Sequence, residues 1–375
     1  MSDRVLFILS NMREIGGAEK SITTLIPHLM EHARLRVFVE NDRHYDDLAR
    51  YAGPRLTLTR MPKGNAPRAI WGALQTLRRG WREDAPDAVL ANGHKGSFLL
   101  AFAGLAGFPK PAPVGIFVRD FNYYLLWLVL RVLPRALYLA PSAAVFEDAR
   151  YRRWGLAAPR RLLALANAVR LRTAPRGDET HAEPPLFVAA CARLARWKGL
   201  HFLLRAWVPV GAAFPAAELR IYGDDVEPDY AAELRALTQE LGLEKVVRFC
   251  GYQSDLTPVF SEAALLVVPS LSVRPGPETF SRIIIEAWAH AKPVVAFAAG
   301  GPRFLIEDGV DGRLIPEGDV EALSRAIIEL LGDPVRRREM GRRGEEKART
   351  QFDPATVAAR LADELLGTNG KGPAA

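Results

Sequence analysis

Short apolar runs alternate with amphipathic segments along the first half of the chain. The apolar runs suit buried strands, and the segments between them repeat apolar residues at helical spacing. This alternation predicts a parallel sheet with helices on both faces. The predicted strands are Val5–Ser10, Leu35–Val39, Leu56–Thr59, Ala88–Ala91, Val114–Val118, Leu137–Ala140 and Leu163–Ala166, and the predicted helices include Ala18–Met30, Pro67–Trp81 and Ser142–Trp154.

A polar, proline-rich stretch at 173–185 interrupts this pattern, which then restarts. The chain has 375 residues, more than one ordinary core needs. We predict an N-terminal domain over 1–172, a linker, a C-terminal domain over 186–353 and a final helical segment over 354–375. The later strands are Leu186–Cys191, Leu219–Tyr222, Val246–Cys250, Leu265–Pro269 and Val294–Phe297, and the last helices are Val320–Leu331, Pro334–Gln351 and Ala355–Leu366.

The predicted fold class is α/β, with two Rossmann-like α/β/α domains facing across a cleft. Open parallel sheets bind ligands beyond the carboxyl ends of their strands, so we expect ligand-binding residues in those loops.

Composition narrows the cellular setting. The chain is 49% hydrophobic and 25% charged, as globular proteins are. The longest uncharged stretch, Gly96–Pro109, is too short to span a bilayer. No signal peptide is recognisable before the first strand. We therefore expect a cytoplasmic protein that is at most peripheral to a membrane.

Charge is divided unevenly along the chain. Residues 1–172 hold 26 Lys and Arg against 14 Asp and Glu, whereas residues 173–375 hold 24 against 29. A basic N-terminal half predicts an anionic partner, either a membrane face or a phosphorylated acceptor, with an inert solvated surface as the alternative. Nucleic acid is not expected, because aromatic stacking motifs and basic helix runs are missing.

One predicted helix carries an apolar stripe flanked by arginines. This pattern is typical of contact with an anionic membrane, and a core-facing helix is the alternative. The stripe is Trp71, Leu74, Leu77 and Trp81, its arginines are Arg68, Arg78, Arg79 and Arg82, and Trp127 lies among leucines further along.

Two glutamates eight residues apart, Glu278 and Glu286, flank a predicted helix start near Phe280. From Phe280 to Glu286 the helix axis would rise about 9 Å, which suits a sugar, a diphosphate and a ribose. Free N–H groups of Phe280 and Ser281 would face the phosphates, and the carboxylates would accept hydrogen bonds from hydroxyls. Glu321 and Glu329 have the same spacing on an expected solvated helix. The spacing alone therefore does not predict a ligand site, and the prediction for Glu278 and Glu286 depends on the strand, loop and helix start around them.

Cations and polar groups follow several predicted strands. Arg193 and Lys198 suit a diphosphate and could stabilise a leaving phosphate without metal, whereas Arg196 fits a solvated basic loop. The chain has no Asp-x-Asp pair, so we expect no metal. Gly16 and Gly17 would let the backbone approach a phosphate, or would simply form a tight turn. His94 and Asp120 follow the fourth and fifth strands, where each could orient a hydroxyl.

Taken together, these motifs resemble retaining glycosyltransferases of family 4, which have the GT-B fold. The segment from Ile285 to Ala289, together with Gly300-Gly301-Pro302, is similar to sequences of enzymes that build lipopolysaccharide and other surface polysaccharides. The motifs are, in order, Gly16-Gly17-Ala18-Glu19, Arg193…Lys198-Gly199, Ile221-Tyr222-Gly223-Asp224, Phe249-Cys250-Gly251-Tyr252, Pro269-Ser270, Glu278-x-Phe280…Glu286-Ala287 and the run from Gly309 to Pro316.

The resemblance implies a UDP- or GDP-hexose as co-substrate, no further cofactor and a lipid-linked or saccharide acceptor. It implies that Arg193 and Lys198 hold the diphosphate, Glu278 the sugar hydroxyls and Glu286 the ribose. The base would meet the backbone at Gly251 and Tyr252, and Thr279, Phe280 and Ser281 would complete the donor loop. Gly16 and Gly17, in the N-terminal domain, would approach the phosphate or the acceptor. The last helix would pack on that same domain. The implied catalytic residues are His94, Asp120 and Glu278.

The chain departs from the family pattern at three points. Arg119 stands where relatives often have His, and either Asn92 or His94 matches the family's strand-four histidine, with His94 favoured. Ser281 replaces a common glycine and would crowd the phosphate. A nucleotide-sugar isomerase of the 2-epimerase kind and a non-catalytic sugar-nucleotide-binding protein are the alternatives.

Overall fold

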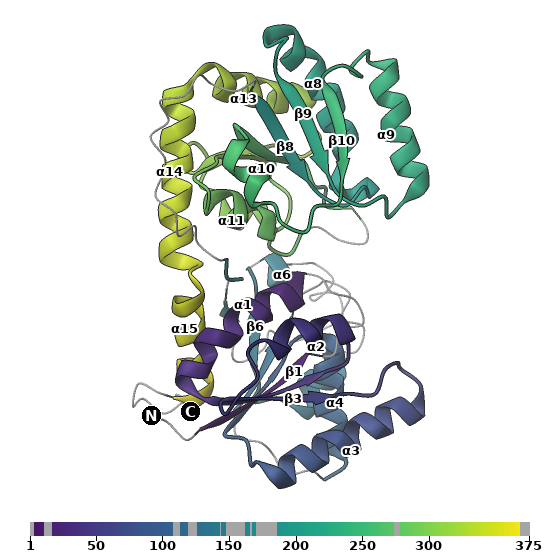
Figure 1. Cartoon of the computed structure of the whole chain (residues 1–375), viewed down its shortest axis with the longest axis vertical. Helices are drawn as coiled ribbons and strands as arrows, with labels where there is room; N and C mark the ends of the chain where they lie inside the picture. Colours follow the sequence, from purple (N-terminus) through teal and green to yellow (C-terminus); the bar gives the residue numbers. More distant parts are fainter. Residues whose placement is uncertain are drawn as a thin grey trace. The chain divides into compact units, whose positions relative to one another are not determined.

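The protein is described by a computed structural model that covers residues 4–10, 17–107, 113–118, 126–142, 144–147, 162–165, 167–169, 186–273 and 278–367. It divides into two compact units, Met1–Ala168 with Asp353–Ala375, and Val169–Phe352 (Figure 1). Each unit is a parallel sheet with helices on both faces, as the alternating pattern predicts. The predicted linker over 173–185 lies outside the described residues.

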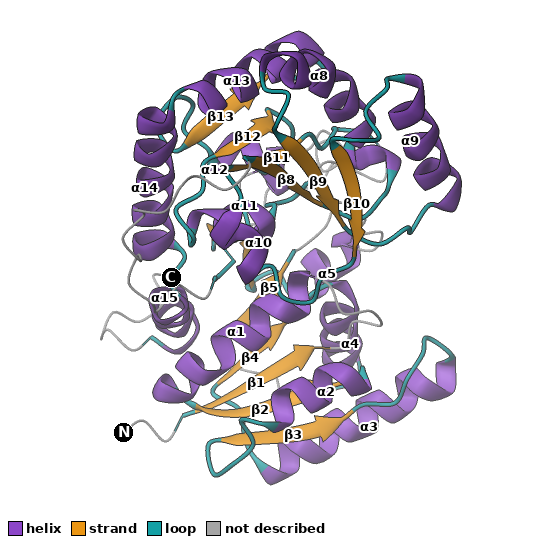
Figure 2. Cartoon of the chain, turned by 45° about the horizontal axis from the view of Figure 1, so that its top comes forward, coloured by secondary structure: helices purple, strands orange, loops and turns teal. Residues whose placement is uncertain are grey.

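The sheet of the N-terminal unit has seven parallel strands in the order β3-β2-β1-β4-β5-β6-β7. Figure 2 labels β1 to β5 of this sheet. β1 lies between β2 and β4, with Leu6 opposite both Leu35 and Ala88. The strands are β1 (Val5–Ser10), β2 (Arg34–Val39), β3 (Leu56–Arg60), β4 (Ala88–Ala91), β5 (Val114–Phe117), β6 (Leu137–Ala140) and β7 (Leu162–Ala164).

Alternate residues of these strands enter two different cores, because successive strand side chains point to opposite faces. Leu6 and Ile8 pack with α1 (Gly17–His32), α2 (Asp42–Ala49) and α15 (Pro354–Leu366). Phe7 and Leu9 pack with the helices of the other face. Those helices are α3 (Pro67–Glu83), α4 (His94–Leu105), α5 (Leu126–Val132) and α6 (Ala144–Glu147).

The sheet of the C-terminal unit has six parallel strands in the order β10-β9-β8-β11-β12-β13. The sequence pattern missed β13, because this strand is short, starts with Gly312 and is only half buried in its middle. The strands are β8 (Phe187–Cys191), β9 (Glu218–Tyr222), β10 (Val247–Gly251), β11 (Leu265–Val268), β12 (Val294–Phe297) and β13 (Gly312–Ile315).

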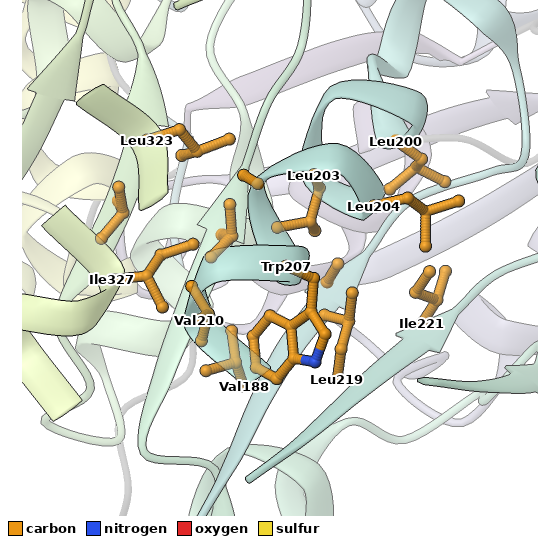
Figure 3. Packing of buried hydrophobic residues seen from close by; sticks show 14 of the residues in the cluster. Val188, Leu200, Leu203, Leu204, Trp207, Val210, Leu219, Ile221, Leu323 and Ile327 are labelled. Carbon is orange, nitrogen blue, oxygen red and sulfur yellow. The ribbon is translucent and has the colours of Figure 1, made fainter. Parts of the chain in front are cut away.

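Trp207 lies at the centre of the core between this sheet and the helices α8 and α13 (Figure 3). Val188 and Leu219 approach it from the strands, and Val210 and Ile327 from the helices. The helices of the unit are α8 (Leu200–Ala213), α9 (Pro228–Glu240), α10 (Thr257–Glu262), α11 (Arg282–Trp288), α12 (Pro302–Leu305), α13 (Val320–Gly332) and α14 (Pro334–Gln351), with a 3-10 turn η1 (Arg196–Lys198). Among the helices of the described ranges, none is long and apolar enough to span a membrane.

Candidate functional site

Three loops at the carboxyl edge of the second sheet are joined by backbone hydrogen bonds. The Ala192 amide donates to the Tyr222 carbonyl at 2.9 Å, and the Gly223 amide donates to the Gly251 carbonyl at 2.9 Å. A Cβ at Gly223 would lie 1.9 Å from the Ala192 oxygen, so only glycine fits this approach. The motif Ile221-Tyr222-Gly223-Asp224 therefore holds the loops after β8, β9 and β10 together.

Lys198 is held beside the end of β11. The Trp197 carbonyl accepts a hydrogen bond of 2.8 Å from the Leu271 amide. Gly199 adopts a φ of 67°, and a Cβ there would lie 2.0 Å from the Pro269 oxygen. The glycine after Lys198 thus permits a close approach of η1 to β11.

Glu278 is held from the opposite side by the loop after β12. Its carbonyl accepts a hydrogen bond of 2.5 Å from the Gly301 amide, and a Cβ on Gly301 would lie 2.5 Å from the Phe280 Cα. The Glu278 carboxylate contacts the Lys198 ammonium and lies 3.4 Å from the Ser270 hydroxyl. The structure thus brings together two of the predicted donor residues, 80 positions apart in the chain.

Helix α11 begins at Arg282, two residues after the predicted start near Phe280. The start is later because Ser281 adopts a φ of 69°, outside the helical region. The first helical N–H groups therefore belong to Arg282 and its successors, which corrects the prediction for Phe280 and Ser281. The Phe280 ring is buried against Phe352, with centroids 5.8 Å apart, so only its main chain is left for a ligand.

Glu286 lies on α11 as predicted, and it binds Arg282 one turn earlier. The Arg282 Nη2 and Nε atoms are 3.0 Å and 3.2 Å from Oε1 of Glu286. Burial raises the pKa of the Cys191 thiol, at the end of β8, to about 12, and the charge of Glu286 adds to this rise. Cys191 is therefore a neutral thiol beside the carboxylate and not a nucleophile.

Arg193, Tyr252 and Thr279 complete the predicted donor residues of this unit. Arg193 is exposed, and its guanidinium has no hydrogen bond or ion pair with any other residue in the described part of the chain. Tyr252 is 50% exposed, and Thr279 is partly buried. Arg196 instead pairs with Glu233, which raises the pKa of the arginine and fits the predicted solvated loop.

The predicted residues of the N-terminal unit have different surroundings. His94 is the first residue of α4 and is partly exposed, whereas Asn92 is 1% exposed and donates to the Ser10 hydroxyl at 3.3 Å. Lys95, next to His94, is bound to the Glu40 carboxylate at 2.7 Å. Gly17 is the exposed first residue of α1. Gly16 and Asp120 lie outside the described residues.

Two side-chain contacts of the site, Arg282 with Glu286 and Ser270 with Glu278, were not predicted from the sequence. The spacing of Arg282 and Glu286, one helical turn, is a signal that could have predicted their ion pair. No local signal predicts the contact of Ser270 with Glu278, because it depends on how the loop folds back. Within the described ranges, no group of three or more His, Cys, Asp or Glu residues could hold a metal ion.

The stripe on α3 does not form the surface that the sequence suggested. Leu77 is fully buried, and Leu74 and Trp81 pack against the same core. The Trp81 ring meets the Phe7 ring edge to face at 5.3 Å. Only Trp71 remains largely exposed, at 63%. Leu74, Leu77 and Trp81 therefore face the core, because the sheet and α4 offer an apolar surface that covers them, and Trp71 faces the solvent.

Residues 185–333 match the family model described as glycosyl transferases group 1. The chain is 32% identical over 179 residues to the lipopolysaccharide core biosynthesis glycosyltransferase LpsE of Rhizobium meliloti, covering 48% of this chain and 49% of LpsE. It is 32% identical over 192 residues to the D-inositol 3-phosphate glycosyltransferase of Corynebacterium kroppenstedtii, and this match covers 50% of this chain and 41% of that protein. The chain thus matches about half or less of the length of these curated relatives.

Solved structures resemble the chain over nearly all of its length. The crystal structure of HepE from Anabaena in complex with UDP and glucose has a TM-score of 0.77 at 22% identity, and the match covers 98% of this chain and 100% of HepE. A glycosyltransferase from Rickettsia africae has a TM-score of 0.80 at 15% identity, over 98% of this chain and 100% of that one. The predicted GT-B fold is confirmed.

Proposed function

We propose that this protein is a retaining, metal-independent hexosyltransferase of family 4. It moves a hexose from a nucleotide diphosphate sugar to a lipid-linked or saccharide acceptor in the assembly of lipopolysaccharide or another surface polysaccharide. The observation that carries the proposal is the junction of Lys198 and Glu278 at the carboxyl edge of the second sheet. One group suits a diphosphate and the other suits sugar hydroxyls.

The surroundings of this pair support a donor site. Arg193 adds an exposed cation at the end of β8, and Glu286 adds a second, partly exposed carboxylate on α11. A diphosphate is met by cations, and hydroxyls are met by carboxylates that accept their hydrogen bonds. These residues lie in the segment that matches the glycosyl transferases group 1 model.

The comparisons favour a UDP-sugar among the possible donors. HepE, which resembles the chain along its whole length, was crystallised with UDP-glucose as well as with UDP. The relatives named for lipopolysaccharide core synthesis favour a polysaccharide acceptor. We place the acceptor on the basic N-terminal unit, where His94 lies at the carboxyl edge of the first sheet and is accessible to a hydroxyl.

The proposal of retention rests on the family resemblance. The proposal of metal independence rests on that resemblance and on the cations of the site. Lys198 and Arg193 can neutralise the charge that develops on the leaving diphosphate. The described residues offer no cluster of ligands that would place a divalent ion there.

Slow donor hydrolysis tests the proposal without knowledge of the acceptor. The purified protein is incubated with UDP- and GDP-hexoses, and release of the nucleoside diphosphate and the anomer of the released hexose are followed by NMR. We expect one nucleotide sugar to be hydrolysed, with the released sugar first appearing in the configuration of the donor. Conversion to a 2-epimer would show an isomerase, and tight binding of a nucleotide sugar without turnover would show a non-catalytic binding protein.

A further inference from the structure

Lys198 and Glu278 neutralise each other in a place that water hardly reaches. Their side chains are 13% and 15% exposed, and the ammonium also lies 4.0 Å from the centre of the Trp197 ring. The same carboxylate oxygen that contacts Lys198 accepts from the Ser270 hydroxyl. Removing one partner from such a pair leaves the other charge poorly solvated, which is costly.

Backbone contacts hold the main chains of both residues in place, so the two charged groups can separate only by rotation of their side chains. Lys198 is fixed by the Leu271–Trp197 hydrogen bond and by the close approach of Gly199 to Pro269. Glu278 is fixed by the Gly301 amide. A ligand that takes the hydrogen bonds of Lys198 must therefore leave the carboxylate in place and satisfy it by other means.

The neighbouring charges do not share this property. Arg193 is exposed, and within the described part of the chain no acidic group pairs with it. Glu286 is paired with Arg282 on the same helix, and its side chain is 27% exposed. Among these four groups, Lys198 and Glu278 form the pair that joins a predicted phosphate contact to a predicted sugar contact.

We propose that the Lys198–Glu278 pair exchanges partners when the donor binds and thereby disfavours the bare nucleoside diphosphate. This inference rests on the proposed function. A nucleotide sugar brings both replacements, because its diphosphate accepts hydrogen bonds from Lys198 and a sugar hydroxyl donates one to Glu278. A nucleoside diphosphate supplies the anion but no hydroxyl. It leaves the buried Glu278 carboxylate without its cation and close to an additional negative charge, so the spent product is released.

Calorimetric titration of UDP and UDP-glucose tests the exchange on wild type and on Glu278→Gln. The glutamine keeps the shape of the side chain but forms no ion pair, so Lys198 becomes free for the phosphate. We expect the affinity for UDP to rise about tenfold and the affinity for UDP-glucose to fall. An unchanged affinity for UDP would mean that Glu278 is only a sugar ligand and would overturn the exchange.

Glu286→Gln is the matched control, because it removes the same charge from the same segment. We expect this variant to bind UDP and UDP-glucose more weakly than wild type by similar factors, since the proposed contact of Glu286 is the ribose, which both ligands carry. A rise in UDP affinity of equal size in this variant would show a general electrostatic effect and would overturn the proposal. If wild type binds neither UDP- nor GDP-linked ligands, the proposed function itself fails.

A structure of the wild-type complex with UDP-glucose gives a second measurement that does not depend on a variant. We expect the Lys198 ammonium on the diphosphate and the Glu278 carboxylate on a sugar hydroxyl, with more than about 4 Å between the two side chains, beyond ion-pair distance. An intact Lys198–Glu278 contact beside the bound donor would overturn the exchange even if Glu278→Gln fails to fold.

Discussion

The Nε2 atom of His44 lies 3.2 Å from the hydroxyl oxygen of Ser10, at the carboxyl end of β1. The other ring nitrogen of His44 lies 3.5 Å from the Thr23 hydroxyl, and Asn92 donates to the same Ser10 oxygen. A buried polar network thus joins β1, β4, α1 and α2 at the edge of the first sheet. Asn92 lies two residues before His94, the first residue of α4, so this network lies next to the start of that helix.

Stability should fall below neutral pH because of His44. Burial lowers the pKa of this histidine to about 4, and the charge of Asp47 opposes the shift only in part. The unfolded chain binds a proton near pH 6.5 and the folded chain does not, so stability declines from there to pH 4, by about 3 kcal/mol in all. Between pH 7 and pH 5 we expect the free energy of unfolding of wild type to fall by about 2 kcal/mol more than that of His44→Gln, measured with urea. Equal slopes in the two proteins would contradict this assignment.

Ser281→Gly should stabilise the protein by about 1 kcal/mol. Ser281 has a φ of 69°, and its buried hydroxyl has no hydrogen-bond partner in the described part of the chain. Glycine accepts this backbone conformation without strain and removes the hydroxyl. The measurement is the midpoint and slope of urea unfolding. Ser281→Ala is the control, since it removes the hydroxyl but keeps the strained φ; an equal gain in this variant would exclude the conformational explanation.

Glu286→Gln should lower donor affinity by one to two orders of magnitude. Loss of a charge-assisted hydrogen bond to a ligand hydroxyl costs about 1.5–3 kcal/mol. The carboxylate is partly exposed, so we expect the thermal midpoint to change little. Glu321→Gln is the matched control on α13, where the side chain is 88% exposed, and it should bind the donor like wild type. Wild-type affinity in Glu286→Gln would remove Glu286 from the donor site.

Lys198→Ala should lower both donor turnover and stability. The substitution removes the proposed diphosphate contact, and it also leaves the mostly buried Glu278 carboxylate without its cation. The double variant with Glu278→Gln should recover much of the stability but not the turnover. Turnover is measured by release of nucleoside diphosphate, and stability by urea unfolding. Full turnover in Lys198→Ala would contradict the assigned site.

Donor hydrolysis should persist in EDTA. The proposed neutralisation of the diphosphate relies on Lys198 and Arg193, so a chelator should change the rate by less than about twofold, since cationic side chains replace the metal. The assay compares EDTA-treated protein with and without added Mg²⁺ or Mn²⁺. Activity that disappears in EDTA and returns with either ion would show that a metal is required.

The predicted membrane contact now depends on charge more than on an apolar stripe. Trp71 is exposed on α3 together with Arg68, Arg78, Arg79 and Arg82. Basic residues near an anionic membrane contribute about 1 kcal/mol each, and salt screens them. We expect co-sedimentation with anionic vesicles at low salt that is lost at high salt and is weaker in Arg68→Glu with Arg79→Glu. Arg342→Glu with Arg343→Glu, on α14, should bind like wild type. Absence of binding at low salt would favour an acceptor free in solution.

The order of the elements and the residues that follow the strands were determined by the sequence. Alternating apolar runs and amphipathic segments encode parallel sheets, because each strand must be covered on both faces. Since all carboxyl ends of a parallel sheet lie on one edge, Arg193, Lys198 and Glu278 could be assigned to that edge before any fold was known. Local patterns of this kind involve residues close together in the sequence, so they can be recognised without knowledge of the fold.

Contacts between distant segments were decided only by the tertiary structure. The pairing of Lys198 with Glu278 depends on Gly199 and Gly301, each of which lets a loop approach another backbone. The direction of the α3 stripe depends on the apolar surface beneath it, which the helix itself does not reveal. Ser281 has a positive φ although its residue type disfavours one, because neighbouring contacts hold the segment at the start of α11. Such features arise from residues far apart in sequence, and packing alone brings them together.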